Sequence, residues 1–243
     1  GLLLEKPRHK GLLLSACSGF TQYAQAFVVQ PADRLEETDL TAARAERRRA
    51  ARLFLRARGY CVRALEVVYP GLVEELSSAP ERALGRTRKK DVPLLYWTGA
   101  SWAAAINVSK GDLDLVADVN VAHALLKRAL ALDPTWDDGA IHELLIVLEA
   151  ALAPAQGGSI EKAREHFRQA WELSGGRRIG ALVTLAESVA VKEQELAEFK
   201  QLLQEALAFD IETAPDFRLA STLAHRRAEW LLGRTGELFV EAE

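Results

Sequence analysis

The sequence predicts an all-α protein, a helical repeat array (α-solenoid) of about 10–12 helices. Three observations predict this fold class. Helical and turn patterns alternate from Val92 to the end of the chain, a set of small and bulky residues recurs along that stretch, and no run of alternating β-branched residues marks a strand. The expected architecture is therefore helices packed on helices, without a sheet.

Composition excludes several classes of protein. The 243 residues are 49% hydrophobic and 27% charged, which is typical of a globular domain long enough for one sizeable core. The net charge of −3 argues against a protein that coats nucleic acid, so no nucleic-acid partner is expected. No stretch approaches the roughly eighteen uninterrupted apolar residues of a membrane span, and we expect no spanning helix.

The N-terminal segment is typical of a bacterial lipoprotein signal. Basic residues come first, a short apolar stretch follows, and Leu14-Ser15-Ala16-Cys17 matches the lipobox pattern, in which the cysteine thiol receives a lipid. This interpretation makes residues 1–17 the remnant of a signal, Cys17 the lipidation site, and residues 18–243 a single helical domain held at a membrane outside the cytoplasm. In the alternative interpretation, Leu12 to Leu14 begin the first packed helix.

The second cysteine, Cys61, lies in an apolar helical stretch. We expect a lone buried thiol there, and a Cys17–Cys61 disulfide is the alternative. Two cysteines cannot form a metal site unaided, and no metal or other cofactor is expected.

A long helix is predicted from about Asp39 to Gly59, and a second over residues 60–78 with a break or kink at Tyr69-Pro70-Gly71. Residues 80–91 are predicted to form a polar connection. The first helix carries arginines every four residues, at positions 44, 48, 52 and 56, so they share one face. We interpret them as a solvated face, and a basic strip that meets a membrane or a partner is the alternative.

The recurring set begins with Ala122, Leu126 and Ala129, and Pro134 follows it. Small residues let two helices approach closely, the bulky residue fills the groove between them, and proline ends the helix because it lacks a hydrogen-bond donor. The second helix of a tetratricopeptide (TPR) repeat has this order of residues, so the set predicts a TPR-like repeat.

The same set occurs again further along the chain. The last small residues of the three sets lie 41 and 36 residues apart, near the TPR period of about 34 residues. Gly99 and Trp102 precede the first set and stand where a TPR first helix has its glycine and its aromatic residue. The later sets, of which the last is a looser match, are Ala163 with Phe167 and Ala170, and Phe199 with Leu203 and Ala206.

From Tyr96 to Phe239 a series of further motifs follows in a fixed order. They are Trp97 with Trp102, Leu132-Asp133-Pro134, Pro154 with Gly157-Gly158, Ala163-x-x-His166-Phe167-x-x-Ala170, Leu202-Leu203, and Leu219-Ala220 with Arg227-Ala228-x-x-Leu231-Leu232. In this order the motifs resemble the T-component family of TRAP transporters, TPR-containing lipoproteins often called TatT.

The resemblance implies a periplasmic, lipid-anchored accessory protein. Such a protein would partner the solute-binding subunit of a tripartite ATP-independent periplasmic (TRAP) transporter. The resemblance also implies a homo-oligomer, for instance a trimer, attached to the membrane only through the lipid on Cys17. A generic TPR scaffold of the cell envelope, which binds other proteins, is the alternative.

Candidate binding residues lie where the first helices of stacked repeats line a concave surface. Tyr96, Trp97 and Trp102 would form a wall suited to a hydrophobic compound or an organic acid. In the alternative interpretation the tryptophans belong to the repeat core and the nearby charges to a solvated loop. The remaining candidates are the charges expected at the mouth of the cleft, Lys110, Asp112, Asp114 and Asp118, and two residues on the next repeat, Trp136 and His142.

No catalytic centre is predicted, and we do not expect an enzyme. The histidines are dispersed, and His142-Glu143 lacks the second histidine of a zinc-binding HExxH helix. The sequence contains neither a Gly-x-Ser-x-Gly elbow nor a phosphate-binding loop.

Overall fold

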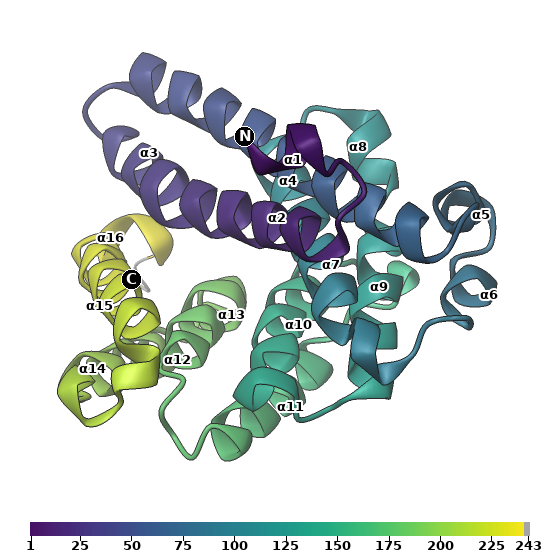
Figure 1. The fold of residues 1–243 in the computed structure, drawn as a ribbon. Helices are drawn as coiled ribbons and strands as arrows, with labels where there is room; N and C mark the ends of the chain where they lie inside the picture. The colour runs from purple at the N-terminus through teal and green to yellow at the C-terminus, as the bar shows by residue number, and fades with distance from the viewer. Residues whose placement is uncertain (241–243) are drawn as a thin grey trace. The chain divides into compact units, whose positions relative to one another are not determined.

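The computed structural model describes residues 1–240, apart from the side chain of Gln156, and these residues are helical with no strand (Figure 1). The all-α prediction is confirmed. The long helices are α2, α4, α7, α9, α10, α11, α14 and α15, with shorter helical turns between them.

The chain divides into two compact units, Gly1–Asp133 (unit 1) and Pro134–Glu243 (unit 2). This division differs from the expected signal remnant at 1–17 followed by one domain at 18–243. Leu13 and Cys17 are fully buried inside unit 1, so the N-terminal residues belong to a folded unit. This is the arrangement of the alternative interpretation, in which Leu12 to Leu14 lie in a packed helix.

Unit 1 is built around four helices. Helix α2 packs along α4, both contact α7, and α7 packs on α9 (Figure 1). The helices of unit 1 are α1 (Leu2–Glu5), α2 (Lys10–Ala24), α3 (Gln30–Leu35), α4 (Leu40–Val68), α5 (Leu72–Ser78), α6 (Pro80–Leu84), α7 (Val92–Val108), α8 (Leu113–Ala117) and α9 (Val119–Leu132), with the turns η1 (Gln25–Val29) and η2 (Lys89–Asp91).

Helix α4 is longer than predicted. It begins where the Asp39 side chain accepts a hydrogen bond from the amide of Ala42 (2.9 Å), which satisfies one of the free amides of the first turn. The predicted boundary at Gly59 is wrong, because buried residues continue across it at helical spacing, from Ala57 to Cys61. The break after Val68 is confirmed.

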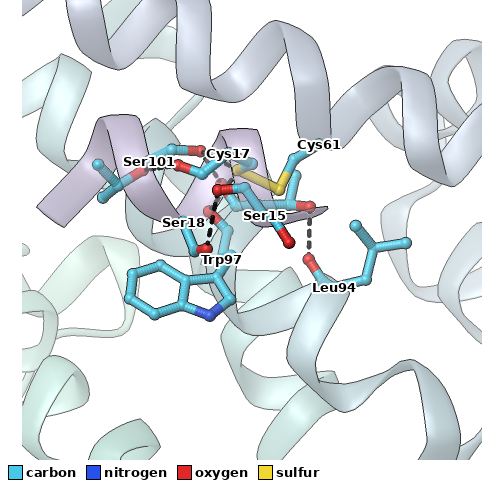
Figure 2. The surroundings of a disulfide bond; sticks show 9 residues. Ser15, Cys17, Ser18, Cys61, Leu94, Trp97 and Ser101 are labelled. Atoms are coloured by element: carbon cyan, nitrogen blue, oxygen red, sulfur yellow. Dashed lines mark hydrogen bonds between the residues drawn. A yellow bond between two sulfur atoms is a disulfide. The ribbon is translucent and has the colours of Figure 1, made fainter. Parts of the chain in front are cut away.

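Cys17 on α2 and Cys61 on α4 form a disulfide, so the prediction of a lone thiol at Cys61 is wrong (Figure 2). The two helices bring the Cα atoms to 5.5 Å, a distance that a disulfide spans. The Cys17 sulfur also lies 3.7 Å from the carbonyl oxygen of Trp97 and 3.9 Å from the hydroxyl of Ser101, both on α7. A sulfur bonded to a second sulfur cannot also carry a lipid, so the disulfide and lipidation at Cys17 exclude each other, and lipidation stays a prediction.

The predicted polar connection, residues 80–91, ends at Asp91, whose buried carboxylate bonds to other parts of unit 1. It accepts hydrogen bonds from Lys10 Nζ (3.0 Å), from the Tyr69 hydroxyl (2.5 Å) and from the backbone amide of Arg88 (3.1 Å). Burial by itself would raise the pKa of Asp91, but these donors outweigh it and the pKa is lowered. Asp91 therefore joins α2, the end of α4 and the start of α7.

The helical run Lys10–Leu35 has the length and composition of a membrane span, with a mean hydropathy of 1.2 over its most apolar window. The expectation that no helix has this composition is thereby corrected. Length and composition are weak evidence for a span, because the core helix of a globular protein passes the same test. One third of the window (33%) is buried inside unit 1.

Unit 2 continues with antiparallel helix pairs. Helix α11 packs on α10, and α12, α14 and α15 pack on one another (Figure 1). The elements of unit 2 are α10 (Ala140–Ala151), α11 (Ile160–Leu173), α12 (Gly180–Leu185), α13 (Val191–Glu193), α14 (Leu196–Ala208), α15 (Arg218–Gly233) and α16 (Thr235–Leu238), with the turns η3 (Trp136–Gly139), η4 (Pro154–Gln156), η5 (Ala186–Ala190), η6 (Ile211–Thr213) and η7 (Pro215–Phe217).

The recurring small residues lie at close helix contacts. In unit 1, a Cβ atom added to Gly99 of α7 would lie 2.7 Å from Leu126 Cγ and 3.2 Å from the carbonyl oxygen of Ala122, both on α9. In unit 2, a Cβ atom added to Gly139 would lie 2.8 Å from the Cα atom of Ala170 on α11. Apart from Phe167, which is partly buried, the members of the three sets are fully buried: Ala122, Leu126, Ala129, Ala163, Ala170, Phe199, Leu203 and Ala206.

We expect Gly99→Ala to lower the free energy of unfolding by about 1–3 kcal/mol, because the new methyl group has no room against α9. The matched control is Gly59→Ala in α4, where nothing lies within 4 Å of the added atom. That substitution should stabilise the protein by roughly 0.5–1 kcal/mol through helix propensity. Urea unfolding followed by circular dichroism measures both, and equal effects would contradict the close contact.

Reduction of the Cys17–Cys61 disulfide should lower the free energy of unfolding by about 2–4 kcal/mol, because the bond restricts the unfolded chain across 44 residues. Urea unfolding with and without dithiothreitol measures the change. The double variant Cys17→Ala/Cys61→Ala should not respond to the reductant. An unchanged midpoint in the wild-type protein would contradict the disulfide.

Candidate functional site

The aromatic residues predicted as a binding wall lie on α7 in unit 1 and differ in burial. Tyr96 and Trp97 are half-buried, and their rings meet edge to face with centroids 5.0 Å apart. In Figure 2 the Trp97 ring points away from the disulfide. Trp102 is only 6% exposed. Tyr96 and Trp97 are therefore the members of the wall that reach the surface.

Trp102 takes part in a polar link between helices. Its indole Nε1 donates a hydrogen bond to Asp118 Oδ2 (3.1 Å), directly before α9. The Arg58 guanidinium lies 4.6 Å from the Trp102 ring centroid and 3.6 Å from Asp118 Oδ2. The polar atom of Trp102 thus has a partner inside unit 1, and the ring packs as a core side chain.

The predicted charges of the following loop point to solvent. Lys110 and Asp114 are exposed, and Asp112 caps α8 by accepting a hydrogen bond from the amide of Leu115 (3.1 Å). Between them Leu113 is 79% exposed. The segment 109–117 therefore presents an exposed apolar side chain between charges of both signs. Such a surface is suited to contact with a protein partner.

In unit 2 the predicted residue Trp136 is half-buried and begins the turn η3. Asp137, Asp138 and Gly139 follow it in the left-handed region, with φ values of 48°, 48° and 91°. Two of these three are not glycine, so the turn is strained and needs support from its surroundings. Arg178 provides that support.

Arg178 binds the strained turn and α10 together. It donates hydrogen bonds to the carbonyl oxygens of Asp137 and Asp138, the latter at 3.2 Å, and to Glu143 Oε2 at 3.1 Å. Burial raises the pKa of Glu143, and the charge and hydrogen bond of Arg178 act in the opposite direction. Arg178 and Glu143 therefore fix the start of α10, on which His142 lies.

His142 is buried and pairs with a second histidine. Its Nδ1 atom lies 2.9 Å from Nδ1 of His166 on α11. The ring also bonds the backbone carbonyl of Pro134, and a carbonyl oxygen can only accept. His142 is therefore the donor to Pro134, and the tautomers of the two rings set which histidine donates within the pair. Desolvation lowers the pKa of His142, although the bond to Pro134 and the charge of Glu165 act to raise it.

The predicted site residues are divided between unit 1 and unit 2, and those within each unit make separate contacts. Trp102 joins Asp118, and His142 joins His166, while Lys110 and Asp114 are exposed. Within residues 1–240, no three histidine, cysteine or carboxylate side chains gather where they could hold a metal ion. A binding role for the candidates stays a prediction.

Three partners of these residues escaped sequence analysis. Arg58 stands apart from the four-residue series of arginines on the same helix, and Arg178 lies in a turn. His166 appears only as part of the motif at residues 163–170. Each is 24 or more residues from its partner in the sequence, and no local pattern links such positions.

Comparison with known proteins places these features in a family. The model of a family described as TRAP transporter T-component matches residues 1–239. A protein of Treponema pallidum (strain Nichols), described as an uncharacterized protein, is 32% identical over 244 residues, which is 99% of this chain and 76% of that protein. The resemblance predicted from Tyr96 onward is confirmed and extends over the N-terminal residues as well.

The pH dependence of stability tests the histidine pair. The lowered pKa means that folded His142 binds fewer protons than it does in the unfolded chain. Its contribution to stability is thus present above its ordinary pKa of 6.5 and is lost as the pH falls below that value. We expect the free energy of unfolding to fall from about pH 7.5 to about pH 5.5, and His142→Gln to reduce this fall. The control is Gln22→Ala on α2, at an exposed residue that does not titrate, and it should leave the fall unchanged. An equal fall in all three proteins, measured by urea unfolding, would contradict the role of the pair.

Proposed function

Because this chain belongs to the TRAP transporter T-component family, we propose that it is an accessory component of a TRAP transport system that docks the solute-binding subunit. The observation that carries the proposal is the family match, which spans residues 1–239 and so includes residues of both compact units. The family is that of a transporter component.

The disulfide supports a location outside the cytoplasm. Disulfides persist in oxidising compartments such as the bacterial periplasm and are rare in the cytosol. Cys17 and Cys61 are both fully buried and bonded to each other. The solute-binding subunit of a TRAP transporter would be in the same compartment, the periplasm.

The polar clusters support a binding role over a catalytic one. The indole of Trp102 and the guanidinium of Arg178 are engaged with groups of their own unit, and His142 is paired with His166. A general acid or base must reach the atom whose proton it transfers, and these buried groups face one another. Exposed side chains are therefore what the protein offers to a partner.

The segment around α8 is the docking surface that we assign. Leu113 is exposed between Lys110 and Asp114, and an apolar centre with a charged rim is the usual anatomy of a protein interface. A bound hydrophobic compound or organic acid is a finer part of the proposal, and we assign it to Tyr96 and Trp97 because both are only half-buried. Self-association into a homo-oligomer is a further part, to be measured by light scattering.

Titration calorimetry with the solute-binding protein of the same transport system tests the docking role. We expect saturable binding with a Kd of roughly micromolar magnitude, and a loss of at least tenfold or so in Leu113→Asp. The matched control is Leu219→Asp on α15 in unit 2, where the leucine is 62% exposed. That variant should bind like the wild-type protein.

Each outcome of this titration has one meaning. No heat of binding at about 100 μM of either protein would contradict the docking role itself. Binding that Leu113→Asp leaves unchanged, or that Leu219→Asp weakens as much, would contradict only the assignment of the surface to α8. Unfolding curves of both variants should match the wild-type curve, because both leucines are exposed.

A further inference from the structure

The outer face of α4 carries a row of arginines without carboxylate partners. Arg44, Arg48, Arg52 and Arg56 are all exposed. The carboxylates of α4 are engaged elsewhere, since Glu46 pairs with Arg49 (3.0 Å) and Glu66 accepts from the backbone amides that follow the helix. Among residues 1–240, no carboxylate forms an ion pair with the arginine row. Its positive charge is therefore available to an anionic surface.

A row of aromatic side chains lies next to these arginines. Phe20 and Tyr23 of α2 and Phe27 of η1 follow one side of the N-terminal helical run, and Tyr23 and Phe27 are 44% and 54% exposed. The Arg56 guanidinium lies 5.7 Å from the Phe20 ring centroid, and Arg49 Nη2 lies 3.4 Å from the Tyr23 hydroxyl. The aromatic row thus meets α4 at Arg49 and Arg56, and the exposed arginines of α4 continue from there. We call these residues together the arginine–aromatic face: Phe20, Tyr23, Phe27, Arg44, Arg48, Arg49, Arg52 and Arg56.

The helical run that bears the aromatic row is unusually apolar for an exposed element. No acidic residue occurs between Glu5 and Asp33, and two thirds of the most apolar window of Lys10–Leu35 is not buried. A spanning orientation would require α2 to leave α4, to which the disulfide ties it. Apolar side chains beside arginines instead suit a helix that lies in the plane of a membrane surface.

We propose that the arginine–aromatic face binds the headgroups of anionic phospholipids, so that unit 1 rests on a membrane surface. The guanidinium groups pair with lipid phosphates, and the exposed rings lie at the level of the headgroups. A single-stranded nucleic acid would also suit arginines and aromatic rings, but the buried disulfide favours an oxidising compartment, where nucleic acid is not the expected partner.

This inference goes beyond the proposed function and does not need the solute-binding partner. It also gives unit 1 a means of membrane attachment that does not use Cys17, whose sulfur is bonded to Cys61. All residues of the arginine–aromatic face lie in unit 1.

Co-sedimentation of the full chain with lipid vesicles tests the inference. One set of vesicles contains phosphatidylcholine only, and the other contains equal amounts of phosphatidylcholine and phosphatidylglycerol. We expect binding to the anionic vesicles, little binding to the neutral ones, and release as the salt concentration rises. Replacement of the arginine row by R44Q/R48Q/R52Q/R56Q should lower the partition coefficient at least about tenfold, and Phe27→Ser should lower it several-fold.

The matched control removes the same charge from other exposed positions of unit 1. It is the variant R82Q/R88Q/K90Q/K127Q, and it should retain the binding of the wild-type protein. Circular dichroism verifies that both variants are folded, which is expected because glutamine and arginine have similar helix propensities.

Two results would overturn the inference. One is the absence of binding to anionic vesicles, or an equal loss of binding in the two quadruple variants. The other is vesicle binding that R44Q/R48Q/R52Q/R56Q leaves intact while it abolishes binding to the solute-binding protein, which would make the face a protein-docking surface. No partner protein is present in the vesicle assay, so its result is independent of the docking role.

Discussion

Close approach between neighbouring helices is the constraint on which the other features of this protein depend. Gly99 and Gly139 leave no room for a side chain against the helices they face, α9 and α11. Each of these helix pairs also carries one polar link, Trp102 to Asp118 between α7 and α9, and His142 to His166 between α10 and α11. Hydrogen bonds of this length require helices that are already in contact. The small residues set the distance, and the polar links fix the register.

A covalent bond, the disulfide, is a second constraint and acts on the N-terminal residues. The disulfide from Cys17 to Cys61 and the bonds to Asp91 hold α2 against α4 and the start of α7. An apolar helix bound in this way can bury only one side, and its other side stays available to the surroundings. The same contacts that bury Cys17 therefore leave an apolar, acid-free surface beside the arginines of α4.

The spacing of the repeats predicted the helices and their contacts, because the size of the residues at an interface determines how closely two helices pack. The anchors from Ala122 to Ala206 are buried, and the break at Tyr69-Pro70-Gly71 lies where proline and glycine require it. The boundary expected at Gly59 failed because one glycine costs little in a helix whose buried positions continue beyond it. The lone thiol expected at Cys61 was wrong because local sequence does not reveal a partner 44 residues away.

The sequence by itself determined the all-α class, the recurring contacts and the family, since each is carried by residue types in a fixed order along the chain. Only the tertiary structure decided which side chains meet. The bond of Cys17 to Cys61, the stacking of Arg58 on Trp102 and the support of the strained turn by Arg178 all join distant segments. Such pairs are set by how helices pack in space, and helical periodicity gives the face on which a residue lies without giving the neighbour it faces.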